Sequence, residues 1–306
     1  MSGHTRTLSE LCRADEPRFG GKSAGLGELL AAGARVPAGF ALACSAYELA
    51  KQEPPLPEVV RAEIARRYAE LGDEVPVAVR SSAVGEDSAE ATFAGQQETI
   101  LWVRGVASVC DAVGECWASL YSPTAVAYRA RLGDQRADPA IGVTVQSMVD
   151  ATVAGVLFTC NPVSGDPSMI AINASWGLGV AVVGGEVTPD DYLVSKVTGE
   201  VVREQVGTKA FEYVQDPSGT GTARLDVPVE RRSVSCLDPS AIAELLDVAR
   251  AIERHFGSPQ DVEWAIAGGA LYVLQSRPVT SVPKRKPAAE PVSALSAVMR
   301  TFGARG

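Results

Sequence analysis

Residues 141–149, with the sequence IGVTVQSMV, mark the point at which the hydrophobic pattern of the chain changes. Strand-like runs follow, AGVLFTCNP at 154–162 and SMIAINASWG at 168–177, separated by turn residues. Before this point the pattern is mainly helical, as in PEVVRAEIARRYAEL at 57–71. We therefore predict an α+β fold with two lobes: a helix-rich lobe over 1–146, a strand-rich lobe over 147–282 and a tail over 283–306.

Turn and cap residues predict several element boundaries. Gly20 and Gly21 introduce a helix over 21–32, and Ser45 stands where a helix N-cap is expected. Asp238 and Pro239 introduce a long helix that Gly257 ends. The pair Gly268-Gly269 then joins DVEWAIA to ALYVLQSRP, which predicts a β-hairpin.

Composition and charge exclude several classes of protein. The 306 residues carry a formal net charge of −9, which is unfavourable for a nucleic-acid partner. No window is apolar over the length that spans a bilayer, and the start MSGHTRTLSELCRADE lacks the apolar region of a secretory signal, so we expect a cytoplasmic protein. The six cysteines form no CxxC pair and are accompanied by only two histidines, so we expect free thiols and no zinc site.

The first candidate for chemistry is the loop Gly20-Gly21-Lys22-Ser23. Glycines permit close approach of the backbone to an anion, a helix start offers free N–H groups, and Lys22 adds a positive charge. It is not a GxxxxGK[ST] loop, because that pattern needs glycine where Glu16 stands. Taken alone, such a helix start can also be purely structural.

The second candidate is the strand end Val79-Arg80-Ser81-Ser82, followed by a loop of small residues up to Thr99. A planar cation and two hydroxyls at a sheet edge suit a phosphate, and the loop is long enough to close over it. A solvated arginine with a polar loop is the alternative.

The third candidate is the C-terminal hairpin. Asp261 and Glu263 share one face of their strand, and Gln275 and Arg277 share a face of the partner strand. Carboxylate and amide oxygens beside a guanidinium can hold Mg²⁺ against a triphosphate. Cross-strand salt bridges without a ligand are the alternative.

Several ordered motifs carry a resemblance that covers about residues 11–280. They are RFGGKSAGLGEL, VPAGFALACSAY, VAVRSSAVGEDS with ATFAGQQET, VTVQSMV, AGVLFTCNP, WGLG with GGEVTPDDYLV, and DVEWAI with YVLQSRP. Together they resemble the nucleotide-binding domain of the pyruvate phosphate dikinase, phosphoenolpyruvate synthase and rifampicin phosphotransferase family. The resemblance implies a two-lobed ATP-grasp-like fold with ATP and Mg²⁺ held between the lobes.

The resemblance also implies a set of ligand-binding residues. Lys22, Arg80 and Arg277 are expected to contact the phosphates and to act in catalysis. Glu263 and Gln275 are expected to bind the metal ion. The closing loop contributes Gly95 and Thr99, and the adenine lies beside Gln146, Met148 and Val149. Two positions depart from the family pattern: Asn173 and Val180 stand where glutamate is usual, which implies a different cleft wall or metal network.

Enzymes of this family also contain a mobile domain with a phosphorylatable histidine in a Thr-Ser-His type motif, and such a motif is absent from this sequence. His4 lies near the start, and His255 lies on the helix before the hairpin, where we interpret it as structural. The resemblance therefore implies an AMP-forming phosphotransferase component that passes a phosphoryl group from ATP to a histidine on a separate partner protein, with a small molecule as the final acceptor. Three alternatives stay open: a stand-alone small-molecule kinase, a nucleotide-binding regulatory module without turnover, and a domain excised from a longer enzyme.

Overall fold

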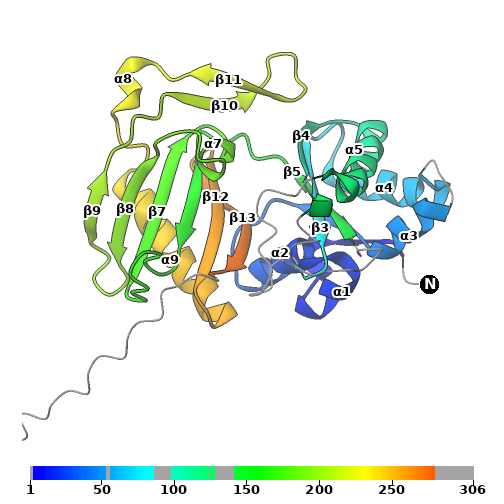
Figure 1. The fold of residues 1–306 in the computed structure, drawn as a ribbon, viewed down its shortest axis with the longest axis horizontal. Coiled ribbons are helices and arrows are strands. Elements are labelled where there is room, and N and C mark those ends of the chain that lie inside the picture. Colours follow the sequence, from blue (N-terminus) through cyan, green and yellow to red (C-terminus); the bar gives the residue numbers. More distant parts are fainter. Residues whose placement is uncertain (1–2, 53–55, 86–97, 124, 128–140, 280–306) are drawn as a thin grey trace, which may run out of the picture.

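The computed structural model describes residues 3–52, 56–85, 98–123, 125–127 and 141–279. Two antiparallel sheets lie side by side, and a two-stranded arm extends from the second sheet toward the first (Figure 1). None of the described helices is long and apolar enough to cross a bilayer.

The first sheet belongs to the helix-rich half of the chain. Its strands are, in spatial order, β1 (Thr5–Thr7), β2 (Gly39–Leu42), β5 (Ile141–Ser147), β3 (Val77–Ala83) and β4 (Thr99–Val103). Its helices are α1 (Glu16–Phe19), α2 (Gly21–Ala31), α3 (Cys44–Gln52), α4 (Glu58–Leu71) and α5 (Val106–Ala118), with 3₁₀ turns η1 (Leu8–Glu10), η2 (Arg13–Asp15) and η3 (Ser119–Tyr121). Buried side chains of α3, α4 and α5 pack on β2, β3 and β5 and form one hydrophobic core.

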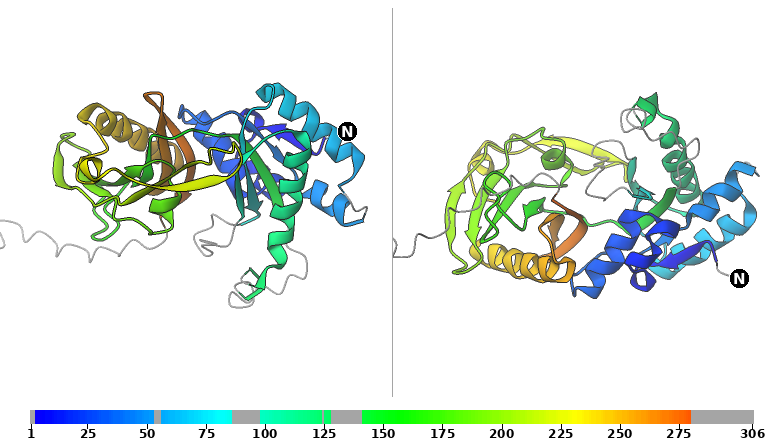
Figure 2. Two further views of the ribbon diagram at one scale, coloured as in Figure 1. Left: turned by 90° about the horizontal axis from the view of Figure 1, so that it is seen from above. Right: turned by 60° about the horizontal axis from the view of Figure 1, so that its bottom comes forward.

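The second sheet belongs to the strand-rich half. Its spatial order is β13 (Ala270–Pro278), β12 (Gln260–Ala267), β6 (Val153–Phe158), β7 (Met169–Trp176), β8 (Asp190–Ser195) and β9 (Val201–Gln205). The arm consists of β10 (Phe211–Gln215) and β11 (Thr222–Asp226), and the helices are α7 (Val180–Val183), α8 (Val229–Arg232) and α9 (Pro239–Phe256). Helix α9 covers one face of this sheet, as the views in Figure 2 show.

The core under α9 also takes residues from the start of the chain. Leu8, Phe19, Leu26 and Leu29 are almost fully buried in the same cluster as Trp264 on β12. Helix α2 therefore packs against the second sheet, although it precedes the first sheet's central strands in sequence. This packing places the N-terminus of α2 at the junction between the two sheets.

Local signals explain the elements that build this junction. Helix α9 begins after Asp238, whose carboxylate accepts a hydrogen bond from the N–H of Ala241 at 2.8 Å, and ends at Gly257, whose φ of 68° is left-handed. The turn between β12 and β13 uses Gly268 and Gly269, with φ of 56° and 75°. Helix α3, in contrast, begins at Cys44, so the predicted N-cap at Ser45 is wrong.

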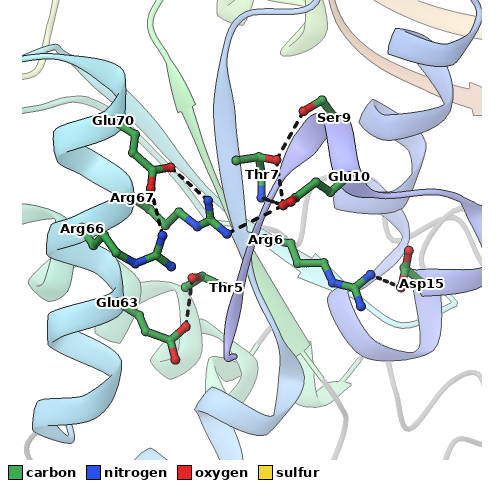
Figure 3. Close-up of polar contacts among 10 residues, drawn as sticks. All are labelled: Thr5, Arg6, Thr7, Ser9, Glu10, Asp15, Glu63, Arg66, Arg67 and Glu70. Carbon is green, nitrogen blue, oxygen red and sulfur yellow. Dashed lines mark hydrogen bonds and ion pairs between the residues drawn. The ribbon is translucent and has the colours of Figure 1, made fainter. Parts of the chain in front are cut away.

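A polar network fixes the edge strand β1 to α4 (Figure 3). The hydroxyl of Thr5 donates to Glu63 at 2.9 Å. Arg67 donates to Glu70 at 3.0 Å and lies 3.7 Å from Glu10, which also accepts a hydrogen bond from the N–H of Thr7, the last residue of β1. These contacts join both ends of β1 to the helix layer (Figure 3).

Candidate nucleotide-binding site

A cavity of about 370 Å³ lies between the two sheets. Its apolar wall combines both halves of the chain: Leu101, Met148, Val149, Ala151, Leu178 and Leu274. Its polar lining residues include Arg80, Thr99, Gln146, Glu186 and Glu263. A mainly apolar cavity with a few converging polar groups is the usual form of a small-molecule site.

Arg80 is the side chain that connects the two sheets at this cavity. From β3 it donates to the carboxylate of Glu263 at 3.2 Å, to the amide oxygen of Gln275 at 2.8 Å and to the carbonyl of Leu274 at 3.0 Å. Glu263 and Gln275 are direct cross-strand partners on β12 and β13. We call Arg80, Glu263 and Gln275 the polar corner of the cavity.

A second ion pair lies next to the polar corner, two residues along the same hairpin. Arg277 binds one oxygen of Asp261 twice, through Nε at 2.9 Å and Nη2 at 2.8 Å. Asp261 is only 8% exposed, and burial raises the pKa of its carboxyl, while Arg277 opposes that rise and Glu263 adds to it. The other carboxylate oxygen, Oδ1, is buried without a hydrogen-bond partner among the described residues.

The Gly-Gly-Lys loop lies against the end of β3. Gly20 has a φ of 82°, and a Cβ at this position would lie 1.9 Å from the carbonyl oxygen of Ser82, so only glycine fits. The N–H of Ser23 donates to the Ser82 hydroxyl at 3.1 Å, and the Lys22 ammonium donates to the carbonyl of Ser81 at 3.0 Å. Lys22 is 4% exposed, so its charge is held inside the junction, one residue along β3 from Arg80.

The chain crosses from the first sheet to the second along the apolar wall. Gln146, near the end of β5, is 3% exposed and donates to the carbonyl of Pro37 at 3.3 Å. Met148 follows, with its N–H bonded to the carbonyl of Pro76 at 2.9 Å, and Val149 packs beside it. This segment leaves β5 directly along the cavity.

The structure brings most of the predicted residues together. Arg80, Thr99, Gln146, Met148, Val149 and Glu263 line the cavity. Gln275 is bonded to Arg80, Lys22 is bonded to the carbonyl of Ser81, the residue after Arg80, and Arg277 is bonded to Asp261, two residues before Glu263 on β12. Gly95 lies outside the described residues.

The sequence did not single out several other residues of the cavity wall, among them Leu101, Leu178, Leu274 and Glu186. Alternation along β13 could have identified Leu274, but no local pattern brings Leu101 and Leu178 together. Glu186 accepts a hydrogen bond from Tyr213 of the arm at 2.9 Å, a contact between separate elements.

Only one of the two positions that depart from the family pattern touches the cavity. Val180 lies in its wall and is 41% exposed. Asn173 is absent from the described wall residues; its amide donates to Asp191 on β8 at 3.3 Å. The predicted difference in the cleft wall therefore falls at Val180.

The donor set around the polar corner fits a hard divalent cation. Glu263, Gln275 and the unpaired Oδ1 of Asp261 offer oxygen atoms of the kind that Mg²⁺ prefers. The described residues contain no group of three or more His, Cys, Asp or Glu side chains that could hold a metal without other ligands. Such a site suits Mg²⁺, which is commonly bound through one or two carboxylates together with substrate phosphates.

Comparison with known proteins identifies relatives of the chain. The probable phosphoenolpyruvate synthase of Methanothermobacter thermautotrophicus is 39% identical, with 92% of this chain and 47% of the relative aligned. The phosphoenolpyruvate synthase of Pyrococcus furiosus is 35% identical, with 97% of this chain and 46% of the relative aligned. The prodigiosin synthesizing transferase PigC of Serratia marcescens is 37% identical, with 87% of this chain and 32% of the relative aligned. The chain thus spans less than half the length of each of these relatives.

The solved structures that resemble the chain share little sequence with it. The dinucleotide-forming acetyl-coenzyme A synthetase 1 of Ca. Korarchaeum cryptofilum has a TM-score of 0.44 and 13% identity, with 83% of this chain and 90% of that chain covered. The D-alanine–D-alanine ligase of Helicobacter pylori has a TM-score of 0.37 and 12% identity, with 85% and 56% covered.

The α+β class and the division into two lobes, each built on its own sheet, are confirmed. The family model described as "Pyruvate phosphate dikinase, AMP/ATP-binding domain" matches residues 52–296, which is more than half of the chain. The chain therefore belongs to the pyruvate phosphate dikinase AMP/ATP-binding domain family.

Proposed function

We propose that this chain binds Mg-ATP in the cavity between its sheets and passes a phosphoryl group to a histidine that lies outside these 306 residues. The observation that carries the proposal is the polar corner, where a guanidinium from one sheet meets a carboxylate and an amide from the other beside an apolar wall. Membership of an AMP/ATP-binding domain family supports ATP as the ligand. The position of the polar corner beside the apolar wall supports an orientation with the phosphates at the polar corner and the base at the wall.

The apolar wall suits the base of the nucleotide. Met148 and Val149 lie at the crossing between the sheets, and they pack in the same hydrophobic cluster as Leu178 on the loop before α7. A planar purine in such a slot buries apolar surface, at roughly 25 cal/mol per Å². Gln146 and the backbone beside it supply the polar contacts for the edge of the ring.

The polar corner and its surroundings suit the triphosphate. Lys22, Arg80 and Arg277 converge on the same junction and supply three positive charges. Glu263 and Gln275 would hold Mg²⁺, with the unpaired oxygen of Asp261 close by on the same hairpin. Bound Mg²⁺ neutralises phosphate charge, while the arginines and Lys22 orient the phosphates, so that catalysis rests on positioning and electrostatics.

Neither histidine of the chain is placed to accept the phosphoryl group. His255 lies on α9, 2.6 Å from Glu28 of α2, and His4 contacts Ser45 at 3.1 Å; neither lines the cavity. An imidazole nitrogen from outside would attack the β-phosphorus, and the bond from that phosphorus to the α,β-bridging oxygen would break to release AMP. Water would then take the γ-phosphoryl group, which gives phosphate and leaves a phosphohistidine.

Incubation with β-labelled ATP tests this proposal. The pure chain is expected to bind ATP but to carry no acid-labile label. With a separately expressed histidine domain of a related phosphoenolpyruvate synthase, AMP and a labelled histidine domain are expected. Acid-labile label on His255 in the pure chain would contradict the proposal, and a His255→Ala variant controls for it.

The same incubation separates two of the alternatives from the proposed function. ADP with a labelled small molecule and no partner would indicate a stand-alone kinase. Binding with neither AMP nor ADP, at any partner concentration, would indicate a regulatory module.

A further inference from the structure

The ligands expected to hold a metal are already bound to a cation of the chain itself. The amide oxygen of Gln275 and Oε2 of Glu263 both accept from Nη2 of Arg80, at 2.8 and 3.2 Å. The Arg80 side chain is 12% exposed and that of Glu263 is 28% exposed, so water screens this pair only partly.

A metal ion and Arg80 compete for these oxygens. Mg²⁺ needs its ligand oxygens at about 2.0–2.1 Å in a near-octahedral arrangement. A guanidinium nitrogen within 2.8 Å of the same Gln275 oxygen would bring two cations together in a site of reduced dielectric. Binding of a free metal ion therefore requires Arg80 to move, at the cost of three hydrogen bonds across the junction.

We expect the Arg80 guanidinium to leave these three partners only when a phosphate is present. Its Nε is buried and has no hydrogen-bond partner among the described residues, so the contacts seen here leave one donor unused. A phosphate can accept two parallel hydrogen bonds from an arginine fork, which is a stronger contact than the Gln275 amide provides.

We propose that Arg80 excludes free divalent metal from Glu263 and Gln275, and that it releases both residues when a triphosphate binds its guanidinium. We call this role of Arg80 the clasp. The inference rests on the proposed function, because it assumes that Glu263 and Gln275 hold the metal. Its consequence is an order of binding, in which the metal enters with the nucleotide and not before it.

The test is the binding of Mn²⁺, followed by the electron paramagnetic resonance signal of the free ion, to the full chain without nucleotide. Wild type is expected to bind Mn²⁺ weakly, and Arg80→Met to bind it at least about tenfold more tightly. Adding Glu263→Gln to Arg80→Met is expected to abolish the gain. Arg203→Met, which removes an arginine that pairs with Asp191 on β8 outside the cavity, is the matched control and should resemble wild type.

Two results overturn the clasp. Equal Mn²⁺ affinity in wild type and Arg80→Met, with both folded by circular dichroism, rejects it while the proposed function stands, provided that wild type with a non-hydrolysable ATP analogue binds more Mn²⁺ than the analogue does alone. If wild type with that analogue binds no more Mn²⁺ than the analogue alone, the metal role of Glu263 and Gln275 is wrong, and the proposed function fails together with the clasp.

Discussion

Replacement of Lys209 by Ala is expected to lower the free energy of unfolding by about 3–5 kcal/mol. The side chains of Lys209 and Asp190 are both fully buried and form an ion pair. Asp190 also accepts hydrogen bonds from the N–H groups of Gly207 and Cys236, each at 2.8 Å, so its carboxylate organises the chain leading into the arm. Removal of the lysine leaves that carboxylate charged and buried without its cation.

Urea unfolding of the purified variants measures this effect. Arg203→Ala is the matched control, since it breaks the pair with Asp191, the residue next to Asp190, but its side chain is 58% exposed. An exposed pair contributes about 0–1 kcal/mol, so little change is expected there. A loss below about 1 kcal/mol in Lys209→Ala would show that the buried pair does not hold the arm.

Replacement of Arg277 by Lys is expected to lower turnover by a factor on the order of 10²–10³, with a much smaller change in Mg-ATP affinity. Arg277 is held by a hydrogen bond through Nε and an ion-pair contact through Nη2 to one oxygen of Asp261, and a lysine cannot reproduce that planar fork. The positive charge would remain, but its position relative to the phosphates would not.

Single-turnover AMP formation with the added histidine domain measures the change in rate. Arg203→Lys provides the control, because Arg203 also binds one oxygen of an aspartate through Nε and Nη2, but outside the cavity. Unchanged turnover in Arg277→Lys would exclude a role for the fork in orienting phosphate.

Local sequence signals predicted much of the fold because the physics behind them is local. The αL glycine at 257 and the turn at Gly268-Gly269 need no tertiary contact to be recognised, and both are confirmed. Ser45 failed as an N-cap because α3 begins one residue earlier and the Ser45 hydroxyl contacts His4 instead. The burial of α2 against the second sheet also lies beyond local patterns, since it depends on how distant segments pack.

The sequence predicted which residues belong to the site better than it predicted which of those residues contact each other. The register set by the turn at Gly268-Gly269 would place Glu263 opposite Leu274, but a register shift between Glu263 and Trp264 pairs it with Gln275 instead. The bonds from Arg80 to Glu263 and Gln275 cross 183 and 195 positions of sequence, and neither periodicity nor spacing could foresee them. Glu186, Leu101 and Leu178 were missed for the same reason: they meet only after the two sheets and the arm have come together.

Calorimetric titration with Mg-ATP tests the central claim, that the cavity between the sheets is the nucleotide site, most directly. Lys22→Met keeps most of the buried apolar stem but removes a charged phosphate contact, so a loss of about 1.5–3 kcal/mol in binding is predicted. Lys196→Met removes a similarly buried lysine that pairs with Glu253 and lies outside the cavity wall, and it should bind Mg-ATP like wild type. Equal affinity in wild type and a folded Lys22→Met, or an equal loss in both variants, would contradict the account.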